Sequence, residues 1–256
     1  MNILFTICGR AGSKGFKNKN LKEMNSVPLV YYALASIRLF CNAHPDYGIT
    51  VALNTDSKEL KRLVEKQKYI PNIAYVWRKD SLAGDKVPKV EVIKDTYMEL
   101  KKSKFFDIII DIDITSPMRR EVDIENVVNI YLSNPEYDLV FSVVKARRSP
   151  YFNMVEKRGE YYKKICGSAF TTRQEAPASY ELNASIYAYR PNFLETDIDK
   201  TILDYKCGIS IMPDFLVLDI DSEEDFRMME ILYIHFCEED IGLEEVYEMA
   251  KNMKNC

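Results

Sequence analysis

The 256-residue sequence is poor in the side chains that build metal centres, disulfide frameworks and membrane spans. It has only two histidines, His44 and His235, which are too few and too far apart for a convincing zinc site. Its six cysteines contain no CxxC pair, a usage typical of proteins in a reducing cytoplasm. No apolar run approaches the roughly 20 residues that a membrane helix needs, so we expect no membrane contact.

The sequence also lacks a strong excess of charge of one sign. A net charge of −4 predicts no general affinity for nucleic acid or for an anionic membrane. The apolar run after Met1 is too short for a signal peptide and has no positively charged segment before it. With 47% hydrophobic and 29% charged residues, the chain fits a single α/β domain over residues 1–256. We therefore expect a cytoplasmic protein with a small ligand.

Glycine is scarce but clustered near the N-terminus. Three of the nine glycines, Gly9, Gly12 and Gly15, follow the apolar run 3–8 at intervals of three residues, which indicates a buried strand ending in a loop. Five basic side chains accompany them before the first acid: Arg10, Lys14, Lys17, Lys19 and Lys22. Glycines allow close backbone approach, and successive N–H groups bind anions. This pattern predicts a polyphosphate-binding loop, with a solvated surface turn as the alternative.

The spacing of this loop excludes two common phosphate-binding templates. A Walker loop ends in Gly-Lys-Ser/Thr, whereas Lys14 is followed here by Gly15. A dinucleotide fingerprint needs Gly-x-Gly-x-x-Gly, which the spacing of Gly9, Gly12 and Gly15 does not match. We expect a phosphate loop that belongs to neither template.

Strand-like and helix-like segments alternate along most of the chain, which predicts parallel βαβ units and a doubly wound, mostly parallel sheet. The rhythm breaks at 145–182, where we expect a small inserted β-rich lobe whose exposed aromatic face is a candidate dimerisation element. We expect Trp77 to lie in the core. The expected strands are 3–8, 48–54, 73–76, 106–114, 139–144, 185–189, 208–212 and 215–218, and the expected helices are 27–40, 58–68, 90–102, 123–133 and 223–236.

Polar residues gather at the ends of the predicted strands, where ligands bind in open parallel sheets. Two aspartate pairs compete there as a Mg²⁺ site, namely Asp219 with Asp221 and Asp111 with Asp113. One residue separates the carboxylates of each pair, so on an extended segment both point the same way. Mg²⁺ takes one or two protein carboxylates and completes its shell with phosphate and water. The alternative for Asp219 and Asp221 is capping of the following helix.

The loop and the strand ends together resemble the cytidylyltransferases that activate sialic acids and related nonulosonic acids. The loop matches that family's Ala-Arg-x-x-Ser-Lys-Gly signature, with Gly9 in place of the alanine, and Lys19-Asn20 follow it. Further matches run in the family's order up to about residue 226: Thr55-Asp56, Arg78, Leu82-Ala83-Gly84-Asp85, Thr115-Ser116-Pro117-Met118-Arg119, Arg173-Gln174, Asn183 and Asp219-Ile220-Asp221. The resemblance implies a Rossmann-like nucleotidyltransferase that uses CTP and an acidic sugar as substrates, Mg²⁺ as its cofactor and a homodimer as its assembly.

The resemblance also implies roles for individual residues. Arg10, Lys19 and Asp221 are expected to take part in catalysis, and Asp219 and Asp221 to hold Mg²⁺. The residues expected at the nucleotide are Gly9, Arg10, Ala11, Gly12, Ser13, Lys14, Asn20, Arg78, Ala83, Asp85 and Lys89. The residues expected at the sugar are Asp113, Ser116, Arg173, Gln174 and Asn183. Among these, the guanidinium of Arg173 suits bidentate pairing with the sugar carboxylate.

Two departures from the family pattern point away from sialic acid itself. Sialate-activating members carry Leu-Gln-Pro before Thr-Ser-Pro, where this chain has Ile112-Asp113-Ile114. In the lobe, Ser149-Pro150-Tyr151-Phe152-Asn153 lacks the basic residue that sialate-specific bacterial members carry after His-Pro. Both features resemble the branch that acts on legionaminic acid. Since an ionised aspartate only accepts hydrogen bonds, Asp113 favours a sugar that offers hydroxyl or N–H donors there.

Two other functions fit parts of the same pattern. In a GT-A-type glycosyltransferase, Asp111 and Asp113 would bind the metal of a nucleotide-sugar, but the basic glycine loop suits a triphosphate better. A non-catalytic nucleotide-binding protein would use the tyrosine-rich lobe to bind a partner. Release of pyrophosphate from CTP and an acidic sugar separates the cytidylyltransferase from both.

Overall fold

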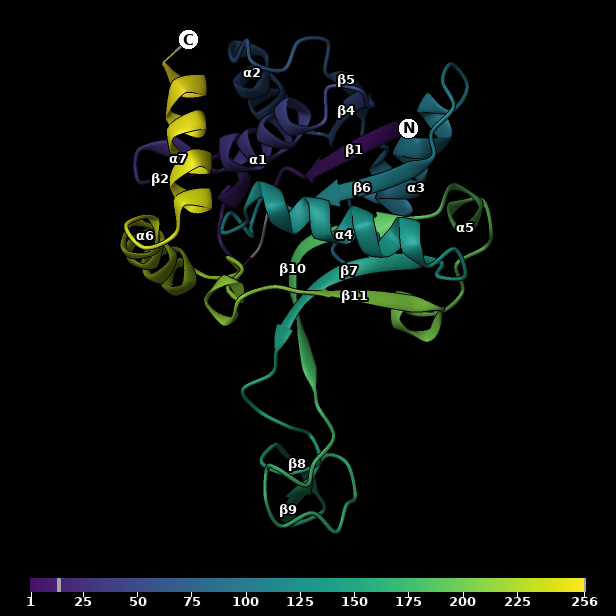
Figure 1. The fold of residues 1–256 in the computed structure, drawn as a ribbon, viewed down its shortest axis with the longest axis vertical. Helices are drawn as coiled ribbons and strands as arrows, with labels where there is room; N and C mark the ends of the chain where they lie inside the picture. Colours follow the sequence, from purple (N-terminus) through teal and green to yellow (C-terminus); the bar gives the residue numbers. More distant parts are fainter. Residues whose placement is uncertain (13–14, 256) are drawn as a thin grey trace.

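A seven-stranded sheet in the order β11-β7-β10-β6-β1-β4-β5 forms the centre of the protein (Figure 1). The structure, a computed structural model, describes residues 1–12 and 15–255, so the predicted nucleotide contacts Ser13 and Lys14 lie outside the described residues. Within this sheet all neighbouring strands run parallel except β10, which is antiparallel to both of its neighbours. The strands are β1 (Asn2–Gly9), β4 (Gly48–Thr55), β5 (Ala74–Trp77), β6 (Ile108–Ile112), β7 (Leu139–Lys145), β10 (Tyr180–Tyr189) and β11 (Cys207–Ile211).

Helices cover both faces of this sheet because its central strands are apolar on both sides. Ile3, Phe5 and Ile7 of β1 pack into one core cluster with α1, α4 and α7, whereas Leu4 packs into a second cluster with α3 and α5. This alternation confirms the predicted doubly wound α/β fold. The helices are α1 (Leu29–Ala43), α2 (Lys58–Lys66), α3 (Lys89–Leu100), α4 (Glu121–Ser133), α5 (Pro191–Leu194), α6 (Glu223–Cys237) and α7 (Ile241–Lys254).

Three local predictions differ from the structure. The segment 215–218 was predicted as a strand, but its first two residues belong to a 3-10 helix, Asp214–Leu216, which starts directly after Pro213. The strand predicted at 185–189 begins earlier, at Tyr180, and runs antiparallel because the inserted lobe returns the chain in the opposite direction. Trp77 was expected in the core but is 53% exposed, since it ends β5, the short strand at the edge of the sheet.

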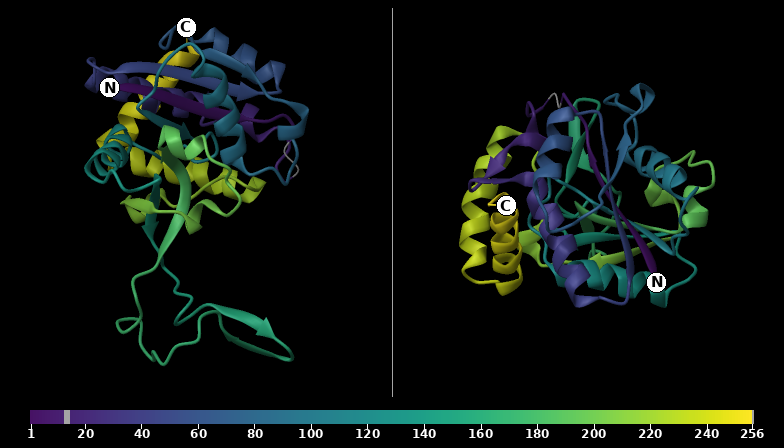
Figure 2. Two further views of the ribbon diagram at one scale, coloured as in Figure 1. Left: turned by 90° about the vertical axis from the view of Figure 1, so that its right-hand side faces the viewer. Right: turned by 90° about the horizontal axis from the view of Figure 1, so that it is seen from above.

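The segment between β7 and β10 leaves the sheet as a long arm (Figures 1 and 2). Its regular structure is a two-stranded antiparallel hairpin of β8 (Val155–Arg158) and β9 (Tyr161–Lys164). Tyr161 and Tyr162 on this hairpin are 71% and 68% exposed. The arm lies within the lobe predicted at 145–182, whose ends belong instead to β7 and β10. The role of the arm in dimerisation stays a prediction.

A second small hairpin, of β2 (Glu23–Met24) and β3 (Val27–Pro28), connects the N-terminal loop to α1. Among the helices of the described residues, none is both long and apolar enough to span a membrane. The cysteines of the described part that carry free thiols are Cys8, Cys41, Cys166, Cys207 and Cys237.

Candidate active site

A cavity of about 610 Å³ opens at the carboxyl ends of the central strands. Its walls come from the loop after β1, the segment after β5, the start of α3 and the segments that follow β6 and precede α6. This is the edge at which a parallel sheet binds ligands. The predicted site residues that line it are Arg10, Lys19, Asn20, Arg78, Asp85, Lys89, Asp113 and Asp221.

The glycine-rich loop is tied to its neighbours by its own polar groups. Arg10 Nη1 lies 2.5 Å from Asp85 Oδ1 and 3.5 Å from the carbonyl oxygen of Ala83. The backbone N–H of Ala11 donates to Asp56 Oδ1 at 2.7 Å, which joins the loop to the end of β4. Asn20 Nδ2 donates to the carbonyl oxygen of Arg10 at 3.1 Å. These contacts hold the described part of the loop in one conformation at the rim of the cavity.

Glycine is required at two positions of this loop. Gly12 has φ +72°, a left-handed conformation that side chains disfavour. A Cβ atom at Gly15 would lie 3.0 Å from the backbone oxygen of Asp221, which cannot move aside easily. The glycine spacing therefore lets the loop bend and lets the segment before α6 approach it closely.

Lys19 connects the loop to the aspartates before α6. Its Nζ donates to the carbonyl oxygen of Ile220 at 2.8 Å and to Asp221 Oδ1 at 3.0 Å. The N–H of Ile220 in turn donates to the carbonyl oxygen of Thr115 at 2.9 Å. Segments more than 100 residues apart in the sequence thus meet at one corner of the cavity.

Asp219 and Asp221 are not used to cap the helix that follows them. Ser222 is the N-cap of α6: its Oγ accepts from the N–H of Asp225 at 3.2 Å, and the Asp225 carboxylate accepts from the N–H of Ser222 at 2.7 Å. Burial, followed by the charges of Asp221 and Asp113, raises the pKa of Asp219 above its ordinary value. Three carboxylates therefore repel one another at this corner, and a cation would relieve that repulsion.

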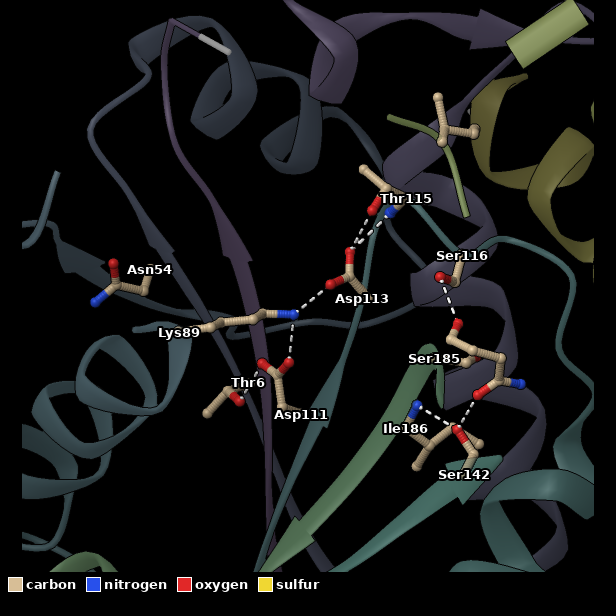
Figure 3. A network of polar contacts seen from close by, with 12 residues as sticks. Thr6, Asn54, Lys89, Asp111, Asp113, Thr115, Ser116, Ser142, Ser185 and Ile186 are labelled. Carbon is tan, nitrogen blue, oxygen red and sulfur yellow. Dashed lines mark hydrogen bonds and ion pairs between the residues drawn. The ribbon is translucent and has the colours of Figure 1, made fainter. Parts of the chain in front are cut away.

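Lys89 lies between two carboxylates at the end of β6 (Figure 3). Its Nζ is 2.6 Å from Asp111 Oδ2 and 2.6 Å from Asp113 Oδ2. Asp111 is fully buried, and its Oδ1 accepts from Thr6 Oγ1 at 2.8 Å. Asp113 Oδ1 accepts from both the N–H and the hydroxyl of Thr115, each at 2.9 Å. Lys89 was predicted to contact the nucleotide, and in the structure its ammonium group pairs with two carboxylates.

This network keeps Asp113 ionised. Burial alone would raise the pKa of Asp113, but the charge and hydrogen bond of Lys89 and the hydrogen bonds from Thr115 outweigh it and lower that pKa to about 2. The two carboxylates raise the pKa of Lys89 against the opposing effect of its burial. Because Asp111 is buried and paired, only Asp113 of the two faces the cavity. This geometry disfavours the metal pair that the glycosyltransferase alternative requires.

Arg78 forms the wall of the cavity next to β4. Its Nε donates to Asn54 Oδ1 at 2.9 Å and its Nη2 to the Asn54 carbonyl oxygen at 3.2 Å. Asn54 Nδ2 donates to Thr96 Oγ1 at 2.9 Å, so the amide is fixed between β4 and α3. The sequence analysis missed Asn54. Its amide near the end of an otherwise apolar buried strand was the signal that could have identified it as a site residue.

A second cavity of about 570 Å³ adjoins the first, and Lys89 and Asp113 line both. Its other walls are more apolar and come from β10 and from the segment 198–202. The sequence analysis missed these walls, although Tyr187 and Tyr189 lie on one face of the strand predicted at 185–189. The lining residues of these two segments are Ala184, Tyr187, Tyr189, Ile198, Asp199, Lys200, Thr201 and Ile202, and Pro88 and Val90 add apolar surface.

Two predicted sugar contacts, Ser116 and Asn183, turn into the protein interior instead. Ser116 Oγ donates to the carbonyl oxygen of Asn183 at 3.0 Å. The Asn183 side chain accepts from Ser142 Oγ at 2.6 Å and donates to the carbonyl oxygen of Leu216 at 3.1 Å. Both residues are buried, at 2% and 1% exposure, and they hold the strand ends together.

Arg119 supports the same region from within. It is fully buried, and its Nη2 donates to the carbonyl oxygens of Asp113 at 2.6 Å and Ser116 at 2.7 Å. The remaining predicted sugar contacts, Arg173 and Gln174, lie on the arm, where Arg173 donates to the carbonyl oxygen of Arg147. Within one chain, the structure brings Asp113 to the cavities and leaves Arg173 and Gln174 on the arm.

Comparison with known families separates the cytidylyltransferase from the two alternatives, a glycosyltransferase and a non-catalytic nucleotide-binding protein. The family model described as cytidylyltransferase matches residues 4–241, which include the glycine-rich loop and the aspartates before α6. The chain belongs to the cytidylyltransferase family. Membership confirms the resemblance of the sequence motifs, and it makes the chain a CTP-using nucleotidyltransferase rather than a glycosyltransferase or a non-catalytic binding protein.

Two curated relatives of this cytidylyltransferase come from Campylobacter. It is 34% identical over 236 residues to the CMP-N,N'-diacetyllegionaminic acid synthase of Campylobacter jejuni, covering 90% of this chain and 94% of that protein. It is 33% identical over 235 residues to the post-translational flagellin modification protein B of Campylobacter coli, with the same coverage of 90% and 94%. Both alignments therefore span nearly the whole of each protein.

Solved structures support the fold of the cytidylyltransferase. The CMP:2-keto-3-deoxy-manno-octonic acid synthetase complexed with CTP superposes with a TM-score of 0.64 at 14% identity, over 92% of this chain and 99% of that chain. The 4-diphosphocytidyl-2C-methyl-D-erythritol synthase of Anaerococcus prevotii superposes with a TM-score of 0.58 at 15% identity, over 91% and 98%. At such identities the likeness concerns the fold alone.

Proposed function

We propose that this cytidylyltransferase activates a nine-carbon acidic sugar of the legionaminic acid type with CTP, giving the CMP-sugar and pyrophosphate. The observation that carries the proposal is the pair of adjoining cavities, one basic and rimmed by the glycine loop, the other more apolar. Asp113 lines both, which is the place where a sugar and a nucleotide would meet. The name of the relative from Campylobacter jejuni supports the same sugar class.

The first cavity suits the nucleotide. Arg10, Lys19 and N–H groups of the loop, such as that of Gly12, would bind the triphosphate. Gly9 and Ala11 would lie beside it, with the N–H of Ala11 donating to Asp56. Ala83 and Asp85 adjoin Arg10, and together with Arg78 they would contact the rest of the nucleotide. Ser13 and Lys14 remain proposed contacts on the sequence alone.

The aspartates before α6 fit a divalent cation. Asp219 and Asp221 offer carboxylate oxygens, the ligands that Mg²⁺ prefers, beside a cavity of triphosphate size. The raised pKa of Asp219 reflects burial and the neighbouring carboxylates, and a bound cation would remove this penalty. We therefore propose that Asp219 and Asp221 hold Mg²⁺. When bound, the ion would offset phosphate charge and orient the phosphate oxygens.

The reaction follows from the two cavities. The anomeric hydroxyl of the sugar attacks the α-phosphorus of CTP in line and releases its proton to solvent water. An O–P bond to the sugar forms, and the bond to the β-phosphate breaks. Arg10 and Lys19 donate N–H groups to the departing pyrophosphate, where negative charge develops. Asp113, with a pKa of about 2, is a poor proton acceptor at neutral pH, so its role is to bind and orient the sugar.

The second cavity suits an acylated sugar. Asp113 accepts hydrogen bonds from hydroxyl or N–H groups, and the apolar walls at Tyr187, Ile198 and Ile202 would receive acyl methyl groups. The sugar carboxylate needs a cation. Of the two lysines that line this cavity, Lys89 is shared by Asp111 and Asp113, and Lys200 lies in the segment 198–202. We propose that Arg173, with Gln174, adds a guanidinium to the cavity from the arm of a second copy in a homodimer.

The cytoplasm remains our expectation for the location of the protein.

A competition assay tests this function. Purified protein is given CTP, Mg²⁺ and a mixture of N,N'-diacetyllegionaminic acid and N-acetylneuraminic acid, and both CMP-sugars are quantified. We expect a higher kcat/KM for the legionaminic acid, because losing a required polar partner in a buried site costs more than losing a methylene. A preference for N-acetylneuraminic acid would refute the specificity, and CTP binding without pyrophosphate release would refute the activity.

A further inference from the structure

Three potential metal ligands meet where α1 ends beside the start of α4, on residues outside the two cavities. His44 follows the last residue of α1, and Glu121 and Glu125 lie one turn apart on α4. Their nearest ligand atoms all lie within 4.8 Å of one another. The sequence analysis excluded a zinc site from the count of histidines alone, which does not reveal glutamates that the fold brings close.

The His44 ring is held in one orientation. The backbone N–H of His44 donates to the carbonyl oxygen of Phe40 at 3.0 Å, which fixes the residue at the helix end. Its ring stacks on Tyr47, with 5.0 Å between centroids and 3° between planes, and its centroid lies 4.4 Å from that of Phe40. This packing directs Nε2 toward Glu121, at 3.8 Å from Oε1. A ligand that is already oriented loses little freedom when it binds an ion.

The facing atoms lack partners. His44 Nε2 and Glu121 Oε1 are both inaccessible to solvent, and neither has a hydrogen-bond partner among the described residues. Their separation of 3.8 Å is too long for a hydrogen bond. Buried polar atoms are nearly always satisfied, so two orphaned atoms that face each other need an explanation.

The surrounding charge favours a cation. Burial, followed by the charge of Glu125, raises the pKa of Glu121, and Glu245 adds to the effect while His44 opposes it. The nearby Arg120 does not neutralise this cluster, because its guanidinium pairs with Asp123 at 2.8 Å and Asp240 at 2.9 Å. Charge repulsion therefore remains among the glutamates.

We propose that His44, Glu121 and Glu125 form a second divalent-cation site, of the Zn²⁺ class, that joins α1 to α4. One imidazole nitrogen and two carboxylates are a donor set that Zn²⁺ accepts, with water as the fourth ligand. Ligands about 2 Å from a tetrahedral ion lie roughly 3.3 Å apart, so rotation of the two glutamate side chains closes the site. The site is structural, and it lies apart from the residues proposed to bind Mg²⁺ and CTP.

Metal binding to the full chain tests this proposal. Chelator-treated protein is titrated with Zn²⁺ in excess Mg²⁺, and Tm is followed together with the visible absorption of Co²⁺ in place of Zn²⁺. We expect one ion per chain, a Tm rise of about 5 °C at a 100-fold excess over Kd, and a Co²⁺ spectrum of low coordination number. His44→Gln and Glu125→Gln should each weaken binding at least about 10-fold.

His235→Gln is the matched control, because His235 also faces a glutamate, Glu239, at 3.7 Å, but on an exposed helix face with no third ligand in the described cluster. It should bind Zn²⁺ as the unaltered protein does. All three variants should retain CTP turnover in Mg²⁺. Unchanged Zn²⁺ affinity in both His44→Gln and Glu125→Gln, or the absence of any Tm shift in the unaltered protein, would overturn the proposal.

Discussion

Lys89 balances the charge of the two carboxylates that close the end of β6. It contacts Asp111 and Asp113 at 2.6 Å each, and Asp111 has no exposed surface. A buried carboxylate without its partner is strongly destabilising. The residue thus contributes to the fold and to the orientation of Asp113 at once.

Replacing this lysine tests that double role. Lys89→Met should lower the free energy of unfolding by about 2–3 kcal/mol, somewhat less than breaking a fully buried pair costs, because 34% of the Lys89 side chain is exposed. Urea denaturation measures the loss. The double variant Lys89→Met/Asp111→Asn should recover part of it, since the unpaired charge is gone, and equal losses in both proteins would contradict the assignment.

The low pKa of Asp113 predicts a pH dependence of stability. Its pKa falls from 3.8 to about 2 on folding, so the ionised form stabilises the fold fully above pH 3.8, and this contribution is lost as the pH falls through 2. Between these values the free energy of unfolding should fall more steeply for the unaltered protein than for Asp113→Asn. Denaturant titrations at several pH values measure the slopes. Asp197→Asn, an exposed aspartate, serves as the control.

Arg10 should act mainly on the rate. Arg10→Ala removes one donor for the departing pyrophosphate, so kcat should fall by a factor equivalent to about 2–4 kcal/mol of transition-state stabilisation. Steady-state kinetics with varied CTP measures this, with Lys17→Ala on the exposed side of the same loop as control. A rise in KM for CTP with unchanged kcat would make Arg10 a ground-state binder instead.

At the scale of elements, β10 combines regular pairing with one irregularity. Its pairing with β7 shifts between Leu182 and Tyr187, and Ala184 within the shift has φ +53°. This left-handed conformation costs free energy in a residue with a Cβ atom. It turns Asn183 inward to its hydrogen bonds and leaves Ala184 in the wall of the second cavity.

Ala184→Gly should therefore separate stability from sugar binding. We expect the free energy of unfolding to rise by about 0.5–1 kcal/mol, because glycine adopts this φ without strain. The KM for the sugar should rise, because a methyl group leaves the cavity wall. Thermal unfolding and steady-state kinetics measure the two effects. In contrast, Ala178→Gly on the arm, whose φ is negative, should not gain stability.

At the scale of the whole molecule, the arm separates two predicted sugar contacts, Arg173 and Gln174, from the cavities of their own chain. Arg173 lies on the arm between β9 and β10, and the hairpin of the arm exposes Tyr161 and Tyr162. Aromatic side chains exposed on a projecting hairpin are typical of an interface. A homodimer would bury them and bring a basic residue to each cavity.

Mixing two inactive variants tests this arrangement. Arg173→Ala and Asp221→Asn should each lose most activity as pure proteins. If each arm serves the other copy, mixed dimers contain one intact site, and an equal mixture should regain about a quarter of the unaltered activity, because half of the dimers are mixed. Pyrophosphate release measures recovery after subunit exchange. No recovery despite mixed dimers would place Arg173 in the site of its own chain.

The sequence by itself determined the alternation of strands and helices, the position of the glycine-rich loop and the family motifs. These depend on local patterns: the period of apolar residues, the glycines that allow positive φ, and the serines that cap helices, such as Ser57 and Ser222. Each of these patterns extends over a few residues, so it can be recognised in the sequence without knowledge of the fold.

Only the tertiary structure decided which side chains meet. The pairing of Lys89 with Asp111 and Asp113, the inward turn of Asn183, the second cavity and the cluster at His44 all join segments from different elements. Trp77 lies at the surface because β5 is an edge strand, which its own sequence does not reveal. Such contacts depend on strand order and on the angle at which each helix packs, and these are set by the burial of the whole core rather than by any local pattern.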